Sequence, residues 1–420
     1  MKKTLDDWLN WQENLHPTEI DLGLARIHQV AERLDVLSPS FPIITVAGTN
    51  GKGSSVAFLE AILIAEGYTT GSYTSPHLIH YNERIKLSGI RASDAQIITA
   101  FKEIDNARKD ISLSYFEFGT LAAMLIFNQQ KVDVVILEVG LGGRLDAANL
   151  WDTSLAIITS IAIDHESWLG NEREAIGKEK AGIMRADTPV ICGDPDPPDS
   201  IKSIALKVKA TLHQINRDFS FQNHANTTWT WKSNKRHYQL PLPTLKGEFQ
   251  LNNAATVIAG LQSLSKHLPV SIESIKAGLK KATIMGRLQL IHSSPDWLVD
   301  VAHNPHSALA LSMYLDEKPT KGKTFALFSM LKDKDIKQVL SIMNKQIDEW
   351  HIVSLEGSRG ITTKALTQIM KSANIKSKVI PHECFSEAVQ SLKKDCKNKD
   401  KVVVFGSFLV VSNVIEIWGS

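Results

Sequence analysis

A glycine-rich turn with one lysine is the feature of this sequence most suited to chemistry. Residues 48–54 read Gly-Thr-Asn-Gly-Lys-Gly-Ser, between the β-branched run 43–47 and a segment with helical apolar spacing. Glycines let backbone N–H groups approach an anion, Lys52 adds a mobile positive charge, and a helix N-terminus favours negative charge. The pattern therefore predicts a phosphate-binding loop between a strand and a helix that begins near Ser55.

This turn departs from the general P-loop pattern at two positions. Val46 stands where that pattern has its first glycine, and Gly53 stands where Ser or Thr directly follows the lysine. A tight turn without a ligand is the alternative interpretation. The buried type of strand before the turn and the apolar helix after it favour phosphate binding.

Three polar residues follow further predicted strands. Ser75, Glu138 and His165 each lie just past an apolar or β-branched run. On a parallel sheet those positions share the edge that carries the phosphate loop, and oxygen ligands there suit Mg²⁺. Singly, they are typical of a turn former, a helix-capping acid and a structural histidine. Their equivalent positions favour a site.

Two more places are less decisive when judged from the residues alone. Lys180, in Glu-Lys-Ala-Gly-Ile, has the spacing of a solvated helix lysine. Asp300, His303 and Asn304 follow a strand in the C-terminal part of the chain, so they either face a cleft or belong to a solvated loop.

The elements that position these residues form two α/β domains. The first has strands at 43–47, 70–74, 132–137, 155–159 and 188–192, with helices between them, which predicts a mostly parallel, doubly wound sheet. Residues 213–243 suggest an antiparallel hairpin appended to that sheet. Helices are expected at 250–265 and 271–282.

Near Gly286 the alternation restarts as a smaller, Rossmann-like domain. Its strands are expected at 297–301, 323–328, 350–354, 377–380 and 401–405, and its helices at 306–315, 335–347, 363–373 and 384–395. We place the domains at 1–290 and 291–420. Clefts between two such domains commonly bind small molecules, which favours an enzyme that joins a nucleotide to a second substrate.

Composition excludes several classes of protein. The 420 residues carry a formal charge of +2, too weak to indicate a nucleic-acid partner or a membrane surface. Cys192, Cys384 and Cys396 form neither a disulfide framework nor a CxxC metal motif. No apolar leader and no run of ~18 apolar residues is present, so we expect a cytoplasmic protein.

With these segments in view, the chain resembles the folylpolyglutamate synthase family, relatives of the Mur ligases, and within it the bifunctional bacterial members. The matching motifs run in family order over nearly the whole chain: 48–54, 74–78, 81–84, 115–118, 138–147, 164–165, 179–183, 286–287 and 300–305. Ala148, Met285 and Ser329 depart from the family pattern. None of them removes a proposed ligand.

The resemblance implies the residues of the site. ATP would be bound by Thr49, Asn50, Gly51, Lys52, Gly53, Ser54, Asn253, Arg287, Asp300 and His303. Two Mg²⁺ ions would be held by Ser75, Glu138, His165 and a carbamylated Lys180, with K⁺ allowed as a further ion. The pterin substrate would contact Ile20, Asp21, Leu22, Gly23, Ser114, Tyr115, Phe116, Glu117, Leu145, Asp146 and Ala147. Catalysis would rest on Lys52, Lys180, His165 and His303.

The chemistry implied by the resemblance is ATP-driven amide formation by a monomer. The carboxylate of dihydropteroate or tetrahydrofolate attacks the γ-phosphate, and the amine of L-glutamate then displaces phosphate from the acyl phosphate. Two anions meet in the first step, so neutralising their charge is the main requirement. Closure of the two domains would keep water from the acyl phosphate.

Three alternatives compete with the bifunctional interpretation. A GTPase-type switch predicts a DxxG segment, which the sequence lacks, and an NKxD reader, whose aspartate would come one place late at Asp348. A cell-wall Mur-type ligase is expected to carry an additional N-terminal domain, yet the loop already starts at Gly48. A folylpolyglutamate synthase without the dihydropteroate activity stays open.

Overall fold

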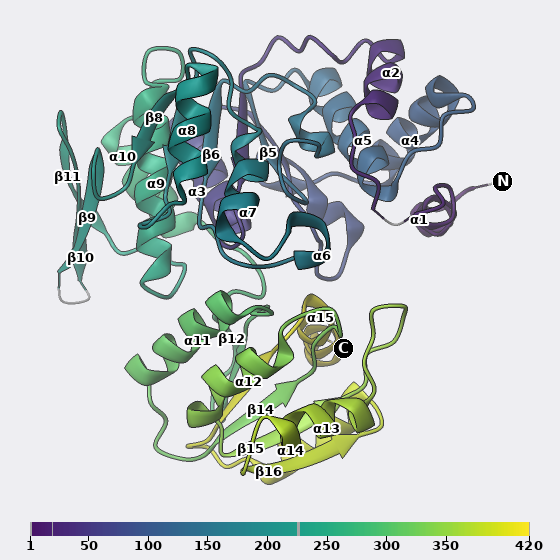
Figure 1. Ribbon diagram of the computed structural model, residues 1–420, viewed down its shortest axis with the longest axis vertical. Helices are drawn as coiled ribbons and strands as arrows, with labels where there is room; N and C mark the ends of the chain where they lie inside the picture. The colour runs from purple at the N-terminus through teal and green to yellow at the C-terminus, as the bar shows by residue number, and fades with distance from the viewer. Residues whose placement is uncertain (1, 19, 225–226, 420) are drawn as a thin grey trace. The chain divides into compact units, whose positions relative to one another are not determined.

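The computed structural model describes residues 2–18, 20–224 and 227–419. The chain divides into two compact units (Figure 1). The first comprises Met1–Ala162, Leu169–Thr244 and Gln250–Thr283, and the second comprises Ile163–Trp168, Leu245–Phe249 and Ile284–Ser420. The second unit therefore takes two short segments from within the chain of the first. The boundary predicted near residue 290 falls inside the second unit and stays a prediction about domain limits.

An eight-stranded sheet forms the centre of the first unit, in the order β4-β3-β2-β5-β1-β6-β7-β8. The parallel strands are β1 (Ile43–Ala47), β2 (Thr70–Tyr73), β5 (Val134–Glu138), β6 (Leu155–Ile158), β7 (Pro189–Cys192) and β8 (Thr211–Gln214). The edge strands β3 (Ile85–Leu87) and β4 (Ile90–Arg91) run antiparallel. Every residue of β1 and β5 is buried, as expected for strands covered on both faces.

Helices cover this sheet, and several begin at side-chain caps. They are α1 (Leu5–Glu13), α2 (Ala25–Arg33), α3 (Lys52–Glu66), α4 (Asp94–Arg108), α5 (Tyr115–Gln130), α7 (Arg173–Ala181), α8 (Asp199–Val208), α9 (Phe249–Ser263) and α10 (Ile272–Lys281). Ser114 starts α5 because its hydroxyl accepts from the amide of Glu117, whose carboxylate accepts from the amide of Ser114. Trp8 of α1 packs against Phe101 and Phe118, with ring centroids 5.9 and 6.5 Å away.

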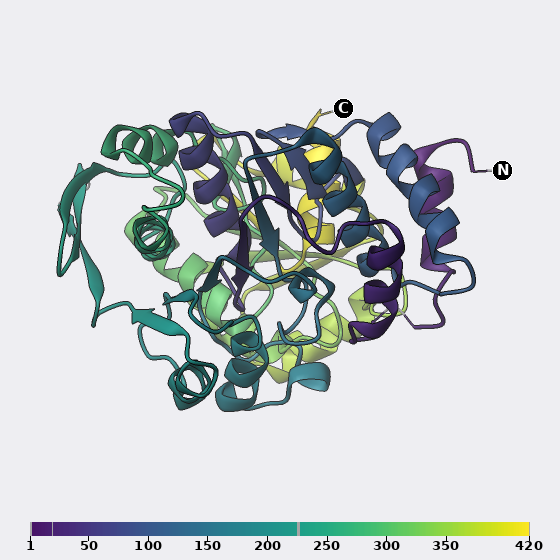
Figure 2. The ribbon, with the colours of Figure 1, turned by 90° about the horizontal axis from the view of Figure 1, so that it is seen from above.

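The predicted hairpin exists, but its expected place in the main sheet is wrong. Strands β10 (Thr228–Ser233) and β11 (His237–Pro241) pair as predicted, and β9 (Phe219–His224), which was not predicted, completes a separate three-stranded sheet. Figures 1 and 2 both show it on the opposite side of the first unit from α1. Trp231 is buried and its indole N–H donates to the Ala255 carbonyl of α9, so this sheet packs on a helix instead of extending an edge.

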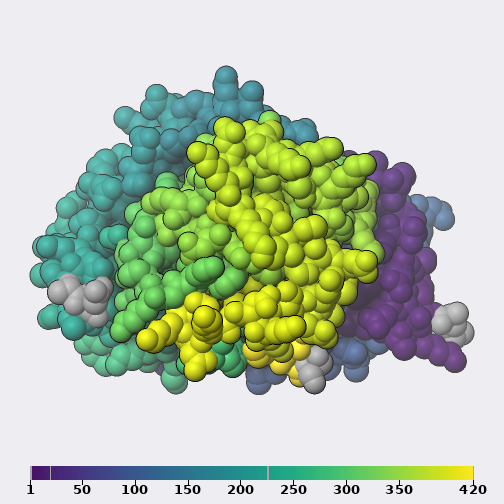
Figure 3. Space-filling model, turned by 90° about the horizontal axis from the view of Figure 1, so that it is seen from below, coloured from purple at the N-terminus to yellow at the C-terminus, as the bar shows by residue number. Residues whose placement is uncertain are grey.

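The second unit contains a six-stranded sheet in the order β12-β13-β17-β14-β15-β16. Its parallel strands are β13 (Asp296–Val299), β14 (Thr324–Phe328), β15 (Glu349–Val353), β16 (Lys378–His382) and β17 (Lys401–Phe405). Its helices are α11 (Pro305–Glu317), α12 (Ile336–Met343), α13 (Thr363–Ser372), α14 (Phe385–Asp395) and α15 (Phe408–Gly419). The antiparallel β12 (Gln289–His292) and α15 were not predicted. Figure 3 draws this unit's surface mainly in green to yellow.

Both sheets agree with the predicted fold class, a mostly parallel doubly wound domain and a smaller Rossmann-like one. Among the helices of the described residues, none has the length and apolar character needed to cross a membrane.

Candidate active site

The loop between β1 and α3 is held by the segment that follows β6. The amide of Thr49 donates to the carbonyl of Ser160 at 2.6 Å, and the hydroxyl of Thr159 donates to the carbonyl of Asn50 at 2.7 Å. A Cβ at Gly48 would collide with the hydroxyl of Thr159, and Gly48 has a φ of +149°. Only glycine therefore fits the first position of this turn.

Helix α3 begins at Lys52, three residues before the predicted start, because the end of the glycine-rich turn is already its first helical turn. Its N-cap is Gly51, with a φ of +90° and no side-chain cap. The ammonium group of Lys52 donates to the carbonyls of Gly48 and Thr49 at 3.1 and 3.2 Å. A folded-back lysine and an uncapped helix N-terminus both suit an anion.

Helix α9 closes one side of this loop. The amide nitrogen of Gln250 donates to the hydroxyl of Ser54 at 3.1 Å, and that of Asn253 donates to the Gln250 side-chain oxygen at 3.0 Å. A Cβ at Gly51 would lie 2.5 Å from the side-chain oxygen of Asn253. Asn253, predicted as an ATP ligand, therefore lies against the loop.

The structure brings Ser75 and Glu138 together at the carboxyl edge of the sheet. Glu138 ends β5, between the strands that lead to Ser75 and to the loop. Only 5% of the residue is exposed. Its carboxylate accepts a hydrogen bond from the amide of Ser75 at 3.1 Å. A hydroxyl and a carboxylate in this position suit Mg²⁺. Within the described residues, no group of three or more His, Cys, Asp or Glu side chains is placed to hold a metal.

His165 lies in the second unit, beside a buried carboxylate. Asp164 accepts a hydrogen bond from the side chain of Asn304 at 3.0 Å, and it lies 3.5 Å from the Nε2 of His303. Lys334 donates to the other oxygen of Asp164 and approaches the Nε2 of His165 at 3.5 Å. The Asp164-His165 motif and the 300–305 motif thus meet inside one unit.

Lys334 was missed by the sequence analysis. It stands in the charged run Lys-Asp-Lys at 332–334, which is typical of a solvated turn, yet only 6% of its side chain is exposed. Burial raises the pKa of Asp164, but hydrogen bonding to His303 and the charge of Lys334 outweigh burial and hold that pKa well below its usual range.

We expect Asp164→Ala to destabilise the protein by about 3–5 kcal/mol, because it leaves the Lys334 ammonium buried without its carboxylate. Urea unfolding measures this loss. Asp333→Ala is the matched control, since its pair with Arg359 is about one-third exposed and should contribute at most ~1 kcal/mol. Equal losses of stability from the two substitutions would contradict the pairing of Asp164 with a buried Lys334. The lowered pKa also means that this stabilisation is present at neutral pH and is lost as the pH falls toward the folded-state value.

Asp300, Arg287 and His303 lie near one another around the start of β12 and the end of β13. The buried carboxylate of Asp300 accepts from the amides of Leu288 and Ala302, each at 2.8 Å. Burial raises its pKa, although the charge of Arg287 opposes the rise. The Nδ1 of His303 donates to the Val301 carbonyl at 2.8 Å, and its Nε2 faces Asp164.

The predicted pterin segments 20–23 and 114–117 are joined by Arg26, which the sequence analysis did not single out. Its guanidinium donates to Asp21 at 2.7 Å and to Glu117 at 3.2 Å. Glu117 is buried. No local pattern marks Arg26, because its partner on α5 is distant in sequence.

The third predicted substrate segment, 145–147, packs beside the second. A Cβ at Gly140 would lie 2.8 Å from the ring of Phe116. Asp146 is buried and accepts from the amides of Leu141 and Ala148 at 2.8 and 2.9 Å, so its first role is to shape this turn. Burial raises the pKa of Asp146 to about 7, although these amides and the charge of Lys52 lower it.

Lys180 is not the solvated helix lysine that its spacing indicates. It lies near the end of α7 and is only 3% exposed. The glycine-rich turn packs directly on its backbone, since a Cβ at Gly143 would lie 3.1 Å from the Lys180 Cα. Lysine side chains are rarely buried this completely, so the burial of Lys180 beside this turn indicates a role other than solubility.

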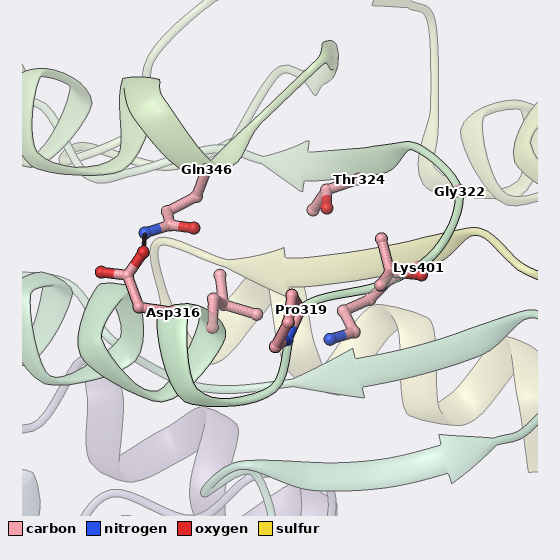
Figure 4. A pocket seen from close by; sticks show the side chains of 8 residues that line it. Asp316, Pro319, Gly322, Thr324, Gln346 and Lys401 are labelled. Carbon is pink, nitrogen blue, oxygen red and sulfur yellow. Dashed lines mark hydrogen bonds between the residues drawn. The ribbon is translucent and has the colours of Figure 1, made fainter.

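A cavity of about 200 Å³ in the second unit lies away from these residues (Figure 4). Its lining includes Asp316, Gln346, Thr324 at the start of β14 and Lys401 at the start of β17. Asp300 instead follows the carboxyl end of β13, so the cavity is at the opposite edge of the sheet.

Comparisons with known proteins match both parts of the chain. The model of the Mur ligase middle domain matches residues 46–261, and that of the Mur ligase, glutamate ligase domain matches residues 286–408. Dihydrofolate synthase/folylpolyglutamate synthase of Escherichia coli K12 is 43% identical over 416 residues, which cover 98% of this chain and 95% of that protein. The chain belongs to the dihydrofolate synthase/folylpolyglutamate synthase family.

Solved structures of this family share the fold over the full chain. E. coli FolC in complex with DHPP and ADP has a TM-score of 0.93 and 41% identity, covering 99% of this chain and 97% of that one. A bifunctional folylpolyglutamate synthase/dihydrofolate synthase with Mn, AMPPNP and L-glutamate bound has a TM-score of 0.91 and 43% identity, covering 100% and 98%. As a member of this family, the chain is an ATP-dependent ligase, and the GTPase-switch alternative is wrong.

Proposed function

We propose that this ligase couples L-glutamate to dihydropteroate, forming dihydrofolate, and to reduced folates, forming polyglutamates. The observation that supports this most is the arrangement of the three substrate segments. Arg26 links Asp21 to Glu117, and Phe116 packs on the turn that contains Asp146. The phosphate loop and the Ser75–Glu138 pair belong to the same unit.

The first step would join two anions, the substrate carboxylate and the γ-phosphate. In our proposal Lys52 leaves the loop carbonyls and pairs with phosphate oxygens, while the uncapped start of α3 directs its N–H groups at them. Mg²⁺ would be held by Ser75 and Glu138, where it would neutralise phosphate charge. His165 and Lys180 are proposed for a second ion, and K⁺ remains an additional proposal.

Residues of the second unit would complete the nucleotide site. Arg287 would supply a guanidinium for phosphate, and the buried carboxylate of Asp300 would offer an acceptor for a hydroxyl. His303 would bind the nucleotide from a ring position fixed by Val301 and Asp164. A neutral amine of L-glutamate would then attack the acyl phosphate, with phosphate leaving. The cytoplasmic location, the monomeric state and the lack of a nucleic-acid partner stay predictions.

The test of bifunctionality is the ratio of the two activities after substitution of Asp146. Asp146→Ala would also remove the acceptor of two turn amides, so Asp146→Asn is the sharper variant. We expect the asparagine variant to lower kcat/KM for dihydropteroate about 10-fold more than for tetrahydrofolate, because only dihydropteroate loses a specific polar contact. Initial rates with each acid measure this ratio.

Asp152→Asn is the control for Asp146→Asn, since 89% of the Asp152 side chain is exposed. It should leave both rates unchanged. Parallel losses in the Asp146 variant would remove its role in selectivity. No reaction of the wild type with dihydropteroate would leave a folylpolyglutamate synthase alone.

Lys180 is expected to carry CO₂ as a carbamate, which turns a buried cation into a carboxylate-like ligand. Solution NMR with ¹³C-bicarbonate should show one protein-bound carbamate signal that disappears in Lys180→Ala. Small carboxylic acids should restore part of the lost activity. Lys178→Ala is the control, because Lys178 is exposed on the same helix. A fully active Lys180→Ala variant would remove this lysine from the site.

A further inference from the structure

Arg84 is a buried cation that has no acidic partner among the described residues. It ends the short 3-10 helix η1 (Tyr81–Arg84) and is 9% exposed. Its Nε donates to the Nδ1 of His77 at 2.8 Å. The hydroxyl of Tyr73 also interacts with the Arg84 side chain, but no carboxylate of the described residues pairs with it.

Two tyrosine rings and a histidine that contact this guanidinium are neutral at pH 7. The guanidinium carbon lies 5.5 Å from the ring centroid of Tyr81 and 5.3 Å from that of Tyr115. Burial raises the pKa of Tyr81 well above its ordinary value and that of Tyr115 to about 12. Burial and the charge of Arg84 together lower the pKa of His77 to about 4. These neighbours stack on the cation and bind one N–H, but none carries a negative charge.

The nearest acid in the sequence is already used elsewhere. The carboxylate of Glu83 accepts from the amides of Leu78, Ile79 and His80 at 2.8, 3.1 and 3.0 Å, and it pairs with Arg91 at 3.6 Å. Across the described parts of the chain, Arg84 forms no ion pair. Arginine cannot discard its charge by deprotonation, and a buried charge without a counter-ion is costly. The site therefore calls for an anion from outside the protein.

The position of Arg84 indicates which anion this is. The carbonyl of Arg84 accepts from the amide of Thr74, which directly precedes Ser75, and its guanidinium faces Tyr115 of the proposed pterin segment. Arg84 thus contacts the proposed pterin segment through its side chain and, through its backbone, the strand end that leads to the proposed metal pair. A carboxylate that extends from that ring toward Glu138 would pass it.

We propose that Arg84 binds the carboxylate of the pterin-bearing acid substrate that is to be phosphorylated. This inference rests on the proposed function and adds a residue to it. The two terminal nitrogens would grip the two carboxylate oxygens as a fork. The grip holds the acid in position and offsets its repulsion from the γ-phosphate.

The proposal predicts opposite effects on stability and binding. Without substrate, the Arg84 charge has no partner, so Arg84→Gln should raise the thermal unfolding midpoint or leave it unchanged. If Arg84 served only to pack the tyrosines, the same substitution would lower the midpoint and leave substrate recognition intact.

The experiment compares dihydropteroate with its neutral carboxamide, each titrated with a non-hydrolysable ATP analogue and Mg²⁺ present. Wild type should bind the carboxylate about 10- to 100-fold more tightly, as expected for charge-assisted hydrogen bonds. Arg84→Gln should bind both compounds equally, at the wild-type affinity for the carboxamide. Arg84→Lys keeps the charge without the fork and should show an intermediate preference. Arg91→Gln, on the nearby edge strand β4, should keep the full preference.

The outcomes separate this inference from the proposed function. Equal binding of carboxylate and carboxamide by wild type would overturn the role of Arg84 and leave the ligase function standing. An Arg84→Gln variant that keeps the preference while its unfolding midpoint falls would show a packing role instead. Failure of wild type to bind either pterin would overturn the proposed substrate class and the inference with it.

Discussion

Lys52→Ala is expected to lower kcat for both acid substrates by about 100-fold or more, a loss on the order of 3 kcal/mol of transition-state stabilisation. In the resting loop the ammonium group donates to the carbonyls of Gly48 and Thr49. Its charge is needed once phosphate charge is present. The unfolding midpoint should therefore change little, by the equivalent of about 1 kcal/mol.

Steady-state rates at saturating ATP and thermal unfolding of the same preparations test the Lys52 prediction. Lys102→Ala is the control, because Lys102 is an exposed residue of α4. A Lys52 variant with near-normal kcat would show that this loop does not hold the transferred phosphate. A variant that is inactive because it is unfolded would be recognised by its lowered midpoint.

Glu138→Gln is expected to depress the dihydropteroate and tetrahydrofolate reactions equally, by about 100-fold, because both share one metal-assisted step. The substitution keeps an oxygen that can accept from the amide of Ser75, so the strand ends should stay in place. Its signature is a higher Mg²⁺ concentration for half-maximal rate. This measurement separates loss of a ligand from loss of a structural hydrogen bond.

The Glu138 and Asp146 substitutions each serve as the control experiment for the other. Glu138→Gln should preserve the ratio of the two activities, whereas Asp146→Asn should shift it. An unchanged Mg²⁺ requirement in Glu138→Gln would restrict Glu138 to positioning Ser75. A changed ratio would place its carboxylate at the acid substrate instead of the metal.

Order along the chain was enough to predict one part of the site. The loop 48–54 and the pair of Ser75 and Glu138 follow parallel strands, and the carboxyl ends of such strands share an edge. To predict that these residues lie close together, it is enough to recognise the strands and their direction. The predicted roles of these residues in binding ATP and metal stay predictions.

Other parts of the site depend on pairs that no local pattern reveals. Arg26 reaches Glu117, and Lys334 reaches Asp164, across long stretches of sequence. A charged side chain in a polar segment is usually solvated, so burial of Lys334 and Lys180 could not be predicted from spacing. The sheet of β9, β10 and β11 was misplaced for a related reason. The two strands of a hairpin are neighbours in the sequence, so their pairing can be predicted. The surface on which the hairpin packs is formed by residues that are distant in the sequence.

The second unit includes short segments from within the sequence of the first unit, and this limits where chimeras of two relatives can be joined. The carboxylate that pairs with Lys334 comes from residues 163–168, which are synthesised long before the rest of the second unit. On the ribosome this stretch has no partner and stays hydrated at little cost. A fragment that starts at Ile284 would keep the buried lysine and lack its counter-ion. Chimeras made from two relatives must therefore transfer 163–168 together with 284–420, or the graft acquires an uncompensated charge in its interior.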